Sequence, residues 1–179
     1  MAIKKIIKYP STSLRAPCVP VDFKEDWFWK AEFLEHLQDL KDTLAATPNG
    51  LALASNQIRP EGWQVFVVRS GDFIGLPEVV INPHWFVKEE NDLLREIVKE
   101  GCLSIPELNE PIERYTDIEV DYFDINGTHL HLIPQNNLSA RIVQHEVEHL
   151  NGGSLVAHLS KRKQTALYSA AIRNRKAGR

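Results

Sequence analysis

The chain has 179 residues, of which 43% are hydrophobic and 25% charged, with a formal net charge of −3, and these are the proportions of an ordinary globular protein. The length predicts a single domain, residues 1–179, with a core of its own. No apolar run reaches about 18 residues and the N-terminal segment lacks the apolar centre of a signal peptide, so we expect a cytoplasmic protein without membrane association.

The first part of the chain predicts a loop followed by a helix. Residues 11–23 are rich in proline and serine, which favours an extended loop. A helix is expected from about Glu25 to Ala46. Its apolar positions recur at helical spacing on one face: Phe33, Leu37, Leu40 and Leu44. Pro48-Asn49-Gly50 ends this helix.

The central part of the chain predicts short strands joined by turns. We expect strands at residues 64–68 and 79–81, the second closed by Asn82-Pro83. Apolar side chains at 118, 120 and 122 alternate with acidic ones and predict a half-buried strand. Asn126-Gly127 is typical of a hairpin turn. On the return strand Leu130 and Leu132 alternate with histidines at 129 and 131, which we expect on an exposed face.

Two further helices are expected near the C-terminus, from about Ser139 to Leu150 and from Lys161 to Asn174. Asn151-Gly152-Gly153 stops the first of them. Helices and strands joined mostly by hairpins and loops favour an α+β fold rather than a βαβ array.

The helix expected at 139–150 carries the sequence HEVEH. His145 and His149 are four residues apart, so their rings project from one helix face about one turn apart and can bind one metal ion. Glu146 is placed to act as a base for a bound water. The alternative is a pair of histidines without a metal.

A catalytic metal site usually has a third protein ligand, whose identity decides the class of enzyme. Downstream of His149 there is no acidic residue, and His158 is the one remaining histidine. Upstream, Cys102 lies in the segment EGCLS beside Gly101, which lets a backbone approach closely. Cys102 could be a metal ligand, a buried structural thiol or a nucleophile; we favour the ligand because HExxH needs a third partner. Two cysteines in the chain do not make a disulfide framework.

Three segments together resemble the peptide deformylases. They are GLALASNQ at 50–57, EGCLS at 100–104 and HEVEH at 145–149, in the order of that family, with VINP at 80–83 between them. The resemblance spans about Ile6 to Leu159. It implies small, mostly antiparallel sheets around a central helix that carries HExxH, and removal of formyl from N-terminal formyl-methionine.

The resemblance also implies roles for single residues. Cys102, His145 and His149 would bind one divalent metal ion, with Glu146 as general acid and base. The Gln57 amide and the Leu103 backbone N–H would stabilise the oxyanion. Ferrous iron is the expected native ion, and zinc, nickel or cobalt could replace it in isolated protein, since one sulfur and two nitrogens suit all four.

A pocket for the methionine side chain follows partly from helix geometry. Leu138 and Ile142 precede His145 by seven and three positions and so share its face; ordinary core packing is the alternative. By resemblance, Leu51 and Val98 would join them. The backbone around Leu51 and Ala52, after Gly50, would pair with the extended peptide like an added strand.

Four positions depart from the family pattern. Glu148 replaces an aspartate, Ala52 replaces a glycine, Ser55 replaces an alanine, and Asn109 stands where an arginine is common. An alanine enters positive φ less readily than glycine. These departures bear on rate and substrate preference more than on the type of reaction.

Residues 160–179 are basic, whereas the rest of the chain is net acidic. They contain no acidic residue and these cations: Lys161, Arg162, Lys163, Arg173, Arg175, Lys176 and Arg179. A basic tail suggests an anionic partner, and the resemblance implies docking on the ribosome. The alternative is a solvated helix end. We expect a monomer that acts on formyl-methionyl nascent peptides.

Two other functions remain open from the sequence. One is a zincin-like endopeptidase, which lacks a clear downstream ligand here. The other is a non-catalytic ribosome- or RNA-binding module with a structural metal, which would need neither Glu146 nor Gln57.

Overall fold

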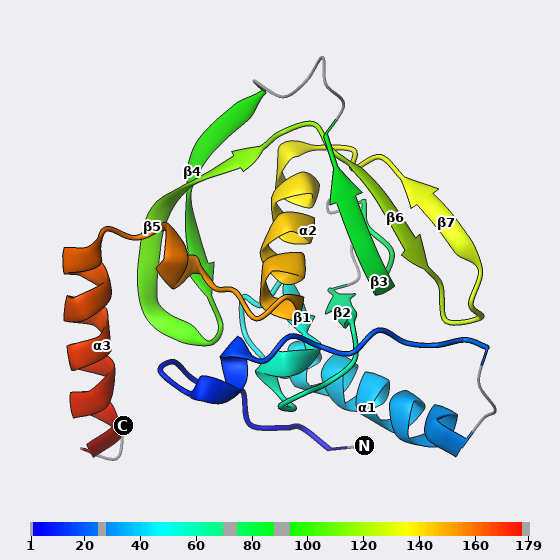
Figure 1. Cartoon of the computed structure of the whole chain (residues 1–179), viewed down its shortest axis with the longest axis horizontal. Helices are drawn as coiled ribbons and strands as arrows, with labels where there is room; N and C mark the ends of the chain where they lie inside the picture. The colour runs from blue at the N-terminus through cyan, green and yellow to red at the C-terminus, as the bar shows by residue number, and fades with distance from the viewer. Residues whose placement is uncertain (1, 25–27, 70–74, 88–93, 177–179) are drawn as a thin grey trace.

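The computed structural model describes residues 2–24, 28–69, 75–87 and 94–176. Its helices are α1 (Phe28–Ala45), α2 (Asn137–Leu150) and α3 (Lys161–Lys176), and these combine with antiparallel sheets (Figure 1). The α+β prediction is therefore confirmed. No helix in the described part of the chain is long and apolar enough to span a membrane.

Two sheets make up the β structure. The larger has the strand order β1-β2-β3-β6-β7 and is antiparallel throughout: β1 (Ala52–Ala54), β2 (Val65–Val68), β3 (Val79–Phe86), β6 (Glu119–Phe123) and β7 (His129–Leu132). The smaller is a long hairpin of β4 (Arg95–Cys102) and β5 (Ile105–Tyr115).

The HExxH helix α2 lies between the two sheets (Figure 1). It begins at Asn137, two residues earlier than expected, because the Asn136 side chain accepts a hydrogen bond from Ser139 N at 2.9 Å and caps the helix. Gly152, with φ +76°, ends it in a left-handed turn. Its apolar face is buried in the main core, so packing on both sides fixes the helix that carries the two histidines.

Helix α1 forms a second core with the larger sheet. All four apolar positions predicted for its inner face are buried, which confirms the helical periodicity: Phe33, Leu37, Leu40 and Leu44. They pack with Val65, Val67 and Ile81. The predicted start of this helix, residues 25–27, lies outside the described residues.

The expected end of β3 is wrong. Asn82-Pro83 does not close the strand, which continues to Phe86 through a register shift between Ile81 and His84. Asn82 adopts φ +48°, and its side chain accepts from Val21 N and donates to Val21 O, both at 2.8 Å. These bonds hold a β-bulge that bends the strand without ending it.

Other elements were not anticipated. Strands β1, β4 and β5 are absent from the prediction, and a short 3-10 helix, Thr12–Arg15, lies within the expected loop. The strand expected near 118–122 is present as β6, with its apolar positions buried. On β7 the histidines are exposed, as expected, while Leu130 and Leu132 pack partly against the core.

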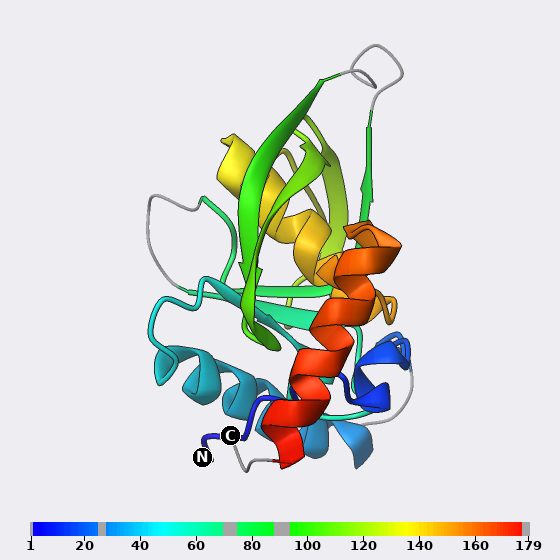
Figure 2. The same cartoon turned by 90° about the vertical axis from the view of Figure 1, so that its left-hand side faces the viewer.

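Helix α3 lies along the side of the β4–β5 hairpin (Figures 1 and 2). Leu167 packs on the small core that contains Leu108 and Ile112 of β5. Tyr168 meets Tyr9 edge to face at 6.4 Å, and Lys163 pairs with Glu110 of β5. Among the described residues, the basic C-terminal helix is therefore attached to the hairpin by an apolar side chain and an ion pair, and to the N-terminal segment by an aromatic contact.

Candidate metal centre and substrate pocket

Three side chains that could hold a metal ion form a cluster where the end of β4 meets α2. Ligand atoms of Cys102, His145 and His149 all lie within 4.8 Å of one another. Cys102 Sγ lies 3.2 Å from His149 Nε2, and the two imidazole rings are 5.0 Å apart between centroids. Cys102, the last residue of β4, thus meets two histidines that follow it by 43 and 47 positions in the sequence.

Glu100, on β4, is the shared partner of several side chains in a buried ion-pair network. Its carboxylate accepts from Arg114 of β5 at 3.1 and 3.2 Å, from Arg141 of α2 at 2.6 Å, and from His145 Nδ1–H at 3.1 Å. Burial raises the pKa of Glu100, but the bonds from His145, Arg114 and Arg141 outweigh it and lower the pKa to about 2. The bond from Nδ1 leaves His145 Nε2 as the nitrogen available to a metal.

Glu146 lies beside this cluster with an unsatisfied oxygen. Its side chain is buried, and among the described residues Oε2 has no hydrogen-bond partner. Burial is the main cause that raises the pKa of Glu146 to about 7. A carboxylate with this pKa can both take and give a proton near neutral pH.

Gln57 is held with its amide nitrogen toward the cysteine. Its Oε1 accepts from Ala54 N at 2.9 Å, and its Nε2 donates to Ser104 Oγ at 3.1 Å. Nε2 also lies 3.9 Å from Cys102 Sγ. The side chain is only 2% exposed, so packing fixes the direction in which this donor points.

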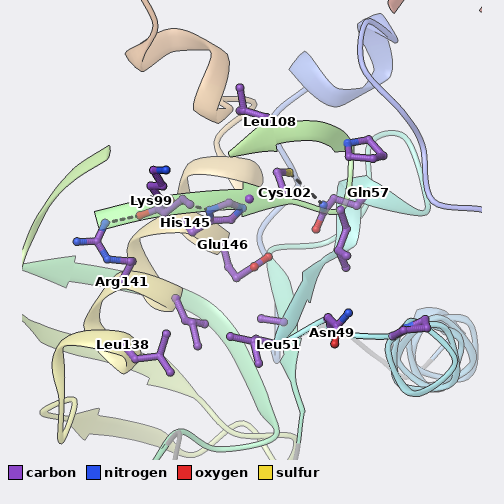
Figure 3. A pocket seen from close by; sticks show the side chains of 18 of the residues that line it. Asn49, Leu51, Gln57, Lys99, Cys102, Leu108, Leu138, Arg141, His145 and Glu146 are labelled. Atoms are coloured by element: carbon purple, nitrogen blue, oxygen red, sulfur yellow. Dashed lines mark hydrogen bonds and ion pairs between the residues drawn. The ribbon is translucent and has the colours of Figure 1, made fainter. Parts of the chain in front are cut away.

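A cavity of about 500 Å³ opens onto these groups (Figure 3). Its lining includes Cys102, His145, Glu146, Gln57 and Leu103, and also the following residues predicted for substrate binding: Gly50, Leu51, Ala52, Gly101, Leu138 and Ile142. Val98 does not line it; its side chain is 41% exposed on β4. His149 contacts Cys102 but is not part of this lining; it lines a separate cavity together with Ser104 and Gly152.

The donor set fits a divalent metal ion. One sulfur and two imidazole nitrogens lie within 4.8 Å of one another, and zinc, iron, cobalt and nickel all accept such a donor set. The partnerless oxygen of Glu146 beside them would be costly to bury unless a water or substrate group bonded to it. His158, the downstream histidine, instead lies 3.0 Å from Glu148 and takes no part in the cluster.

The departures at Glu148, Ser55 and Ala52 are accommodated by local contacts. Glu148 accepts from Arg114 Nη2 at 2.8 Å, so the longer side chain still reaches the ion-pair network. Ser55 Oγ is bonded to His36 Nε2 at 2.7 Å, which satisfies the buried hydroxyl. Ala52 lies in β1 and is not among the residues with positive φ, so glycine is not needed there by the fold.

Three residues that line or support the cavity were not predicted from the sequence: Arg141, Arg114 and Lys8. Arg141 precedes His145 by four positions on α2, so its place on the same face could have been inferred from helical spacing. Arg114 and Lys8 carry no such signal, because the β4–β5 register and the path of the N-terminal segment bring them to the site.

Comparison with known proteins gives one family. Residues 3–165 match the sequence model described as polypeptide deformylase. A peptide deformylase of Desulfotalea psychrophila is 34% identical over 176 residues, covering 97% of this chain and 96% of the relative. Peptide deformylase 2 of Vibrio cholerae is 34% identical over 164 residues, covering 92% and 90%.

Solved structures agree with the sequence matches. The peptide deformylase from Ehrlichia chaffeensis in complex with actinonin has a TM-score of 0.80 and 27% identity, covering 97% of this chain and 98% of that one. A peptide deformylase from Legionella pneumophila has a TM-score of 0.78 and 25% identity, covering 99% of each chain.

Proposed function

This chain belongs to the polypeptide deformylase family, and we propose that it removes the N-terminal formyl group of formyl-methionyl polypeptides with the side chains described below. It is a metallohydrolase, and formate is the product of the hydrolysis. The observation that carries the assignment of roles is the convergence of Cys102, His145 and His149 beside Glu146 at the base of one cavity.

Cys102 Sγ, His145 Nε2 and His149 Nε2 would hold one divalent ion, which we propose is ferrous iron in the native protein, with zinc, nickel or cobalt able to replace it. When bound, such an ion acts as a Lewis acid and lowers the pKa of a coordinated water. The bond from His145 to Glu100 orients that ring and occupies its Nδ1, so that Nε2 would be the nitrogen that binds the ion.

Glu146 is the proposed general base. Its free Oε2 takes the proton of the attacking water, and the same carboxyl then gives that proton to the leaving amine nitrogen. The bond between the formyl carbon and that nitrogen breaks, which releases formate and a free N-terminus. The Gln57 amide and the Leu103 backbone N–H stabilise the developing oxyanion.

Methionine would enter the apolar part of the cavity beside His145. Ile142 and Leu138 come from the same face of α2, and Leu51 approaches from the segment before β1 (Figure 3). Val98 remains a proposed substrate contact, but its exposed side chain would have to turn toward the peptide to make it. The backbones of Gly50, Leu51, Ala52 and Gly101 offer the peptide strand-like pairing. A Cβ on Gly101 would make only ordinary contact, at 3.5 Å from Leu108 O, so the fold itself leaves room there for a close substrate backbone.

The larger context of the reaction is a set of further proposals. We infer one domain over residues 1–179, active as a monomer. Formyl-methionyl nascent chains arise where proteins are synthesised, which supports a cytoplasmic location. The exposed cations of α3 support docking on ribosomal RNA, which rewards clustered Lys and Arg through counterion release.

The assay that tests the function offers three substrates to anaerobically prepared protein: formyl-Met-Ala-Ser, acetyl-Met-Ala-Ser and casein. We expect formate from the first substrate and neither acetate nor new peptides from the others. The chelated protein should lose activity and regain it more fully with ferrous iron than with zinc. Cleavage of casein without formate release would point to an endopeptidase, and no hydrolysis at all would point to a structural metal.

A further inference from the structure

The lining of the cavity includes three Lys or Arg side chains, and two of them already donate hydrogen bonds to other groups of the protein. Arg141 donates to Glu100 Oε1 at 2.6 Å and to the carbonyls of Ile112 and Glu96 at 3.0 and 2.9 Å. Lys8 Nζ donates to Leu103 O at 2.5 Å. The third is Lys99, which also lines the cavity (Figure 3) and is exposed.

Lys99 has no ion-pair partner in the part of the chain that the structure describes. The register of the hairpin gives the reason. Lys99 lies opposite Pro111, and the next pair on the same face is Gly101 with Asn109, which is neutral. Glu100 and Glu110 face the other way and are already paired with arginines and with Lys163. Glu113 lies on the same face, opposite Ile97, but is paired with Arg95 at 3.4 Å. The face of the hairpin that carries Lys99 therefore presents an uncompensated positive charge.

The position of Lys99 matches a particular part of the substrate. This step rests on the proposed function, in which the formyl group sits beside Cys102. Lys99 precedes Cys102 by three residues on β4, which is about 10 Å along a strand. An extended peptide covers the same length in about three residues, and the edge of β4 away from β5 has no strand paired with it in the described sheets.

We propose that Lys99 is a specificity-determining residue that favours formyl-methionyl peptides with a carboxylate side chain at the second or third residue. An aspartate or glutamate there would supply the acid that the hairpin lacks. Because the pair is exposed to solvent, its effect is modest and sensitive to salt.

The test uses formyl-Met-Xaa-Ser and formyl-Met-Ala-Xaa peptides in which Xaa is Glu, Gln or Lys. All carry C-terminal amides, so that the side chain is the sole carboxylate. At low salt we expect kcat/KM for the Glu peptide to exceed that for the Lys peptide by roughly two- to five-fold at one of the two positions, and the ratio to fall toward one at high salt. Lys99→Glu should reverse the order. Lys161→Glu, which changes net charge equally but lies on α3 outside the cavity, should keep it.

The outcomes separate this inference from the function on which it rests. Formate from the neutral Gln peptides tests the deformylase activity alone. Equal kcat/KM for Glu and Lys peptides at low salt in the unmodified protein would overturn the role of Lys99, and so would an unchanged order in Lys99→Glu. The comparison within the unmodified protein needs no variant, so poor folding of Lys99→Glu would not rescue the idea. No formate from any peptide would overturn the activity together with the inference.

Discussion

At the scale of single residues, the site depends on side chains whose surroundings give each of them one task. Glu146 is buried with a free oxygen, which suits proton transfer, whereas Glu100 is buried and fully bonded, which suits holding other groups in place. Two glutamates of the same cavity therefore differ in pKa: burial raises the pKa of Glu146 to about 7, whereas the bonds from His145, Arg114 and Arg141 lower the pKa of Glu100 to about 2. The contrast, together with the free oxygen, supports the acid–base role that we propose for Glu146.

Replacement of Glu146 by alanine should separate catalysis from metal binding. Because Glu146 is not among the three clustered ligand side chains, Glu146→Ala should keep its metal while turnover falls by about two to four orders of magnitude. Metal analysis and formate release on the same preparation check both parts. Near-normal turnover in metal-loaded Glu146→Ala would remove Glu146 from the mechanism.

His36 predicts a pH dependence of stability. Burial, followed by the charge of Arg59, lowers the pKa of His36 to about 4 from 6.5. Between these values the unfolded chain binds a proton that the folded protein excludes, so stability is present above pH 6.5 and is lost as pH falls toward 4. The loss amounts to about 3 kcal/mol at most. In urea titrations at pH 7 and pH 4.5, His36→Gln should lose less stability than the unmodified protein, and equal losses would contradict the assignment.

At the scale of elements, Glu100 joins β4, β5 and α2 at the metal centre. Its removal would leave Arg141 as a buried, uncompensated cation and would leave Arg114 with Glu148 as its one remaining ion-pair partner among the described residues. Glu100→Gln should therefore lower the unfolding free energy by roughly 3–5 kcal/mol and weaken metal binding about 10- to 100-fold. Glu113→Gln on the same hairpin is the matched control, because its pair with Arg95 is exposed and should contribute little. Similar effects of the two variants would mean that the buried network does not support the site.

Changes to the charge of helix α3 should affect docking on the ribosome but not the hydrolysis of short peptides. Reversal of its exposed cations, Lys161, Arg162, Arg173 and Arg175, spares Lys163, which holds the hairpin. We expect weaker ribosome co-sedimentation with a flatter salt dependence, and unchanged activity on a formyl tripeptide. Leu167→Ala tests the alternative of a purely structural helix, because it loosens packing without altering charge. Unchanged co-sedimentation at low salt after charge reversal would leave α3 as a solvated helix.

The sequence predicted some elements well and others not at all, for reasons that the structure makes clear. Helices with a one-sided apolar face, such as the one carrying Leu37 and Leu40, reveal themselves by periodicity. Strands β4 and β5 could not be recognised in this way, because their charged and apolar residues do not alternate simply. Their side chains and carbonyls instead meet particular partners, such as Arg141 and Lys163 of α3. The strand end at Asn82 was mispredicted because its bonds to Val21 come from a distant part of the chain.

At the scale of the whole molecule, the fold brings three distant segments to one cavity. Residues of the segments 50–57, 100–104 and 145–149 line this cavity together, because α2 lies between the larger sheet and the β4–β5 hairpin (Figure 1). The spacing of His145 and His149 predicted the metal-binding helix directly, whereas the roles of Gln57 and Leu103 were implied by the resemblance of their segments to the deformylases. The supporting residues Arg114 and Lys8 were not predictable, because only the tertiary arrangement places them there.

The central claim is that Cys102, His145 and His149 hold one metal ion in this cavity. X-ray absorption on zinc-loaded protein, at one ion per chain, measures this directly. We expect one sulfur at about 2.3 Å and two imidazole nitrogens at about 2.1 Å, with the sulfur lost in Cys102→Ser. A spectrum with no sulfur ligand in the unmodified protein, or one left unchanged by Cys102→Ser, would contradict it.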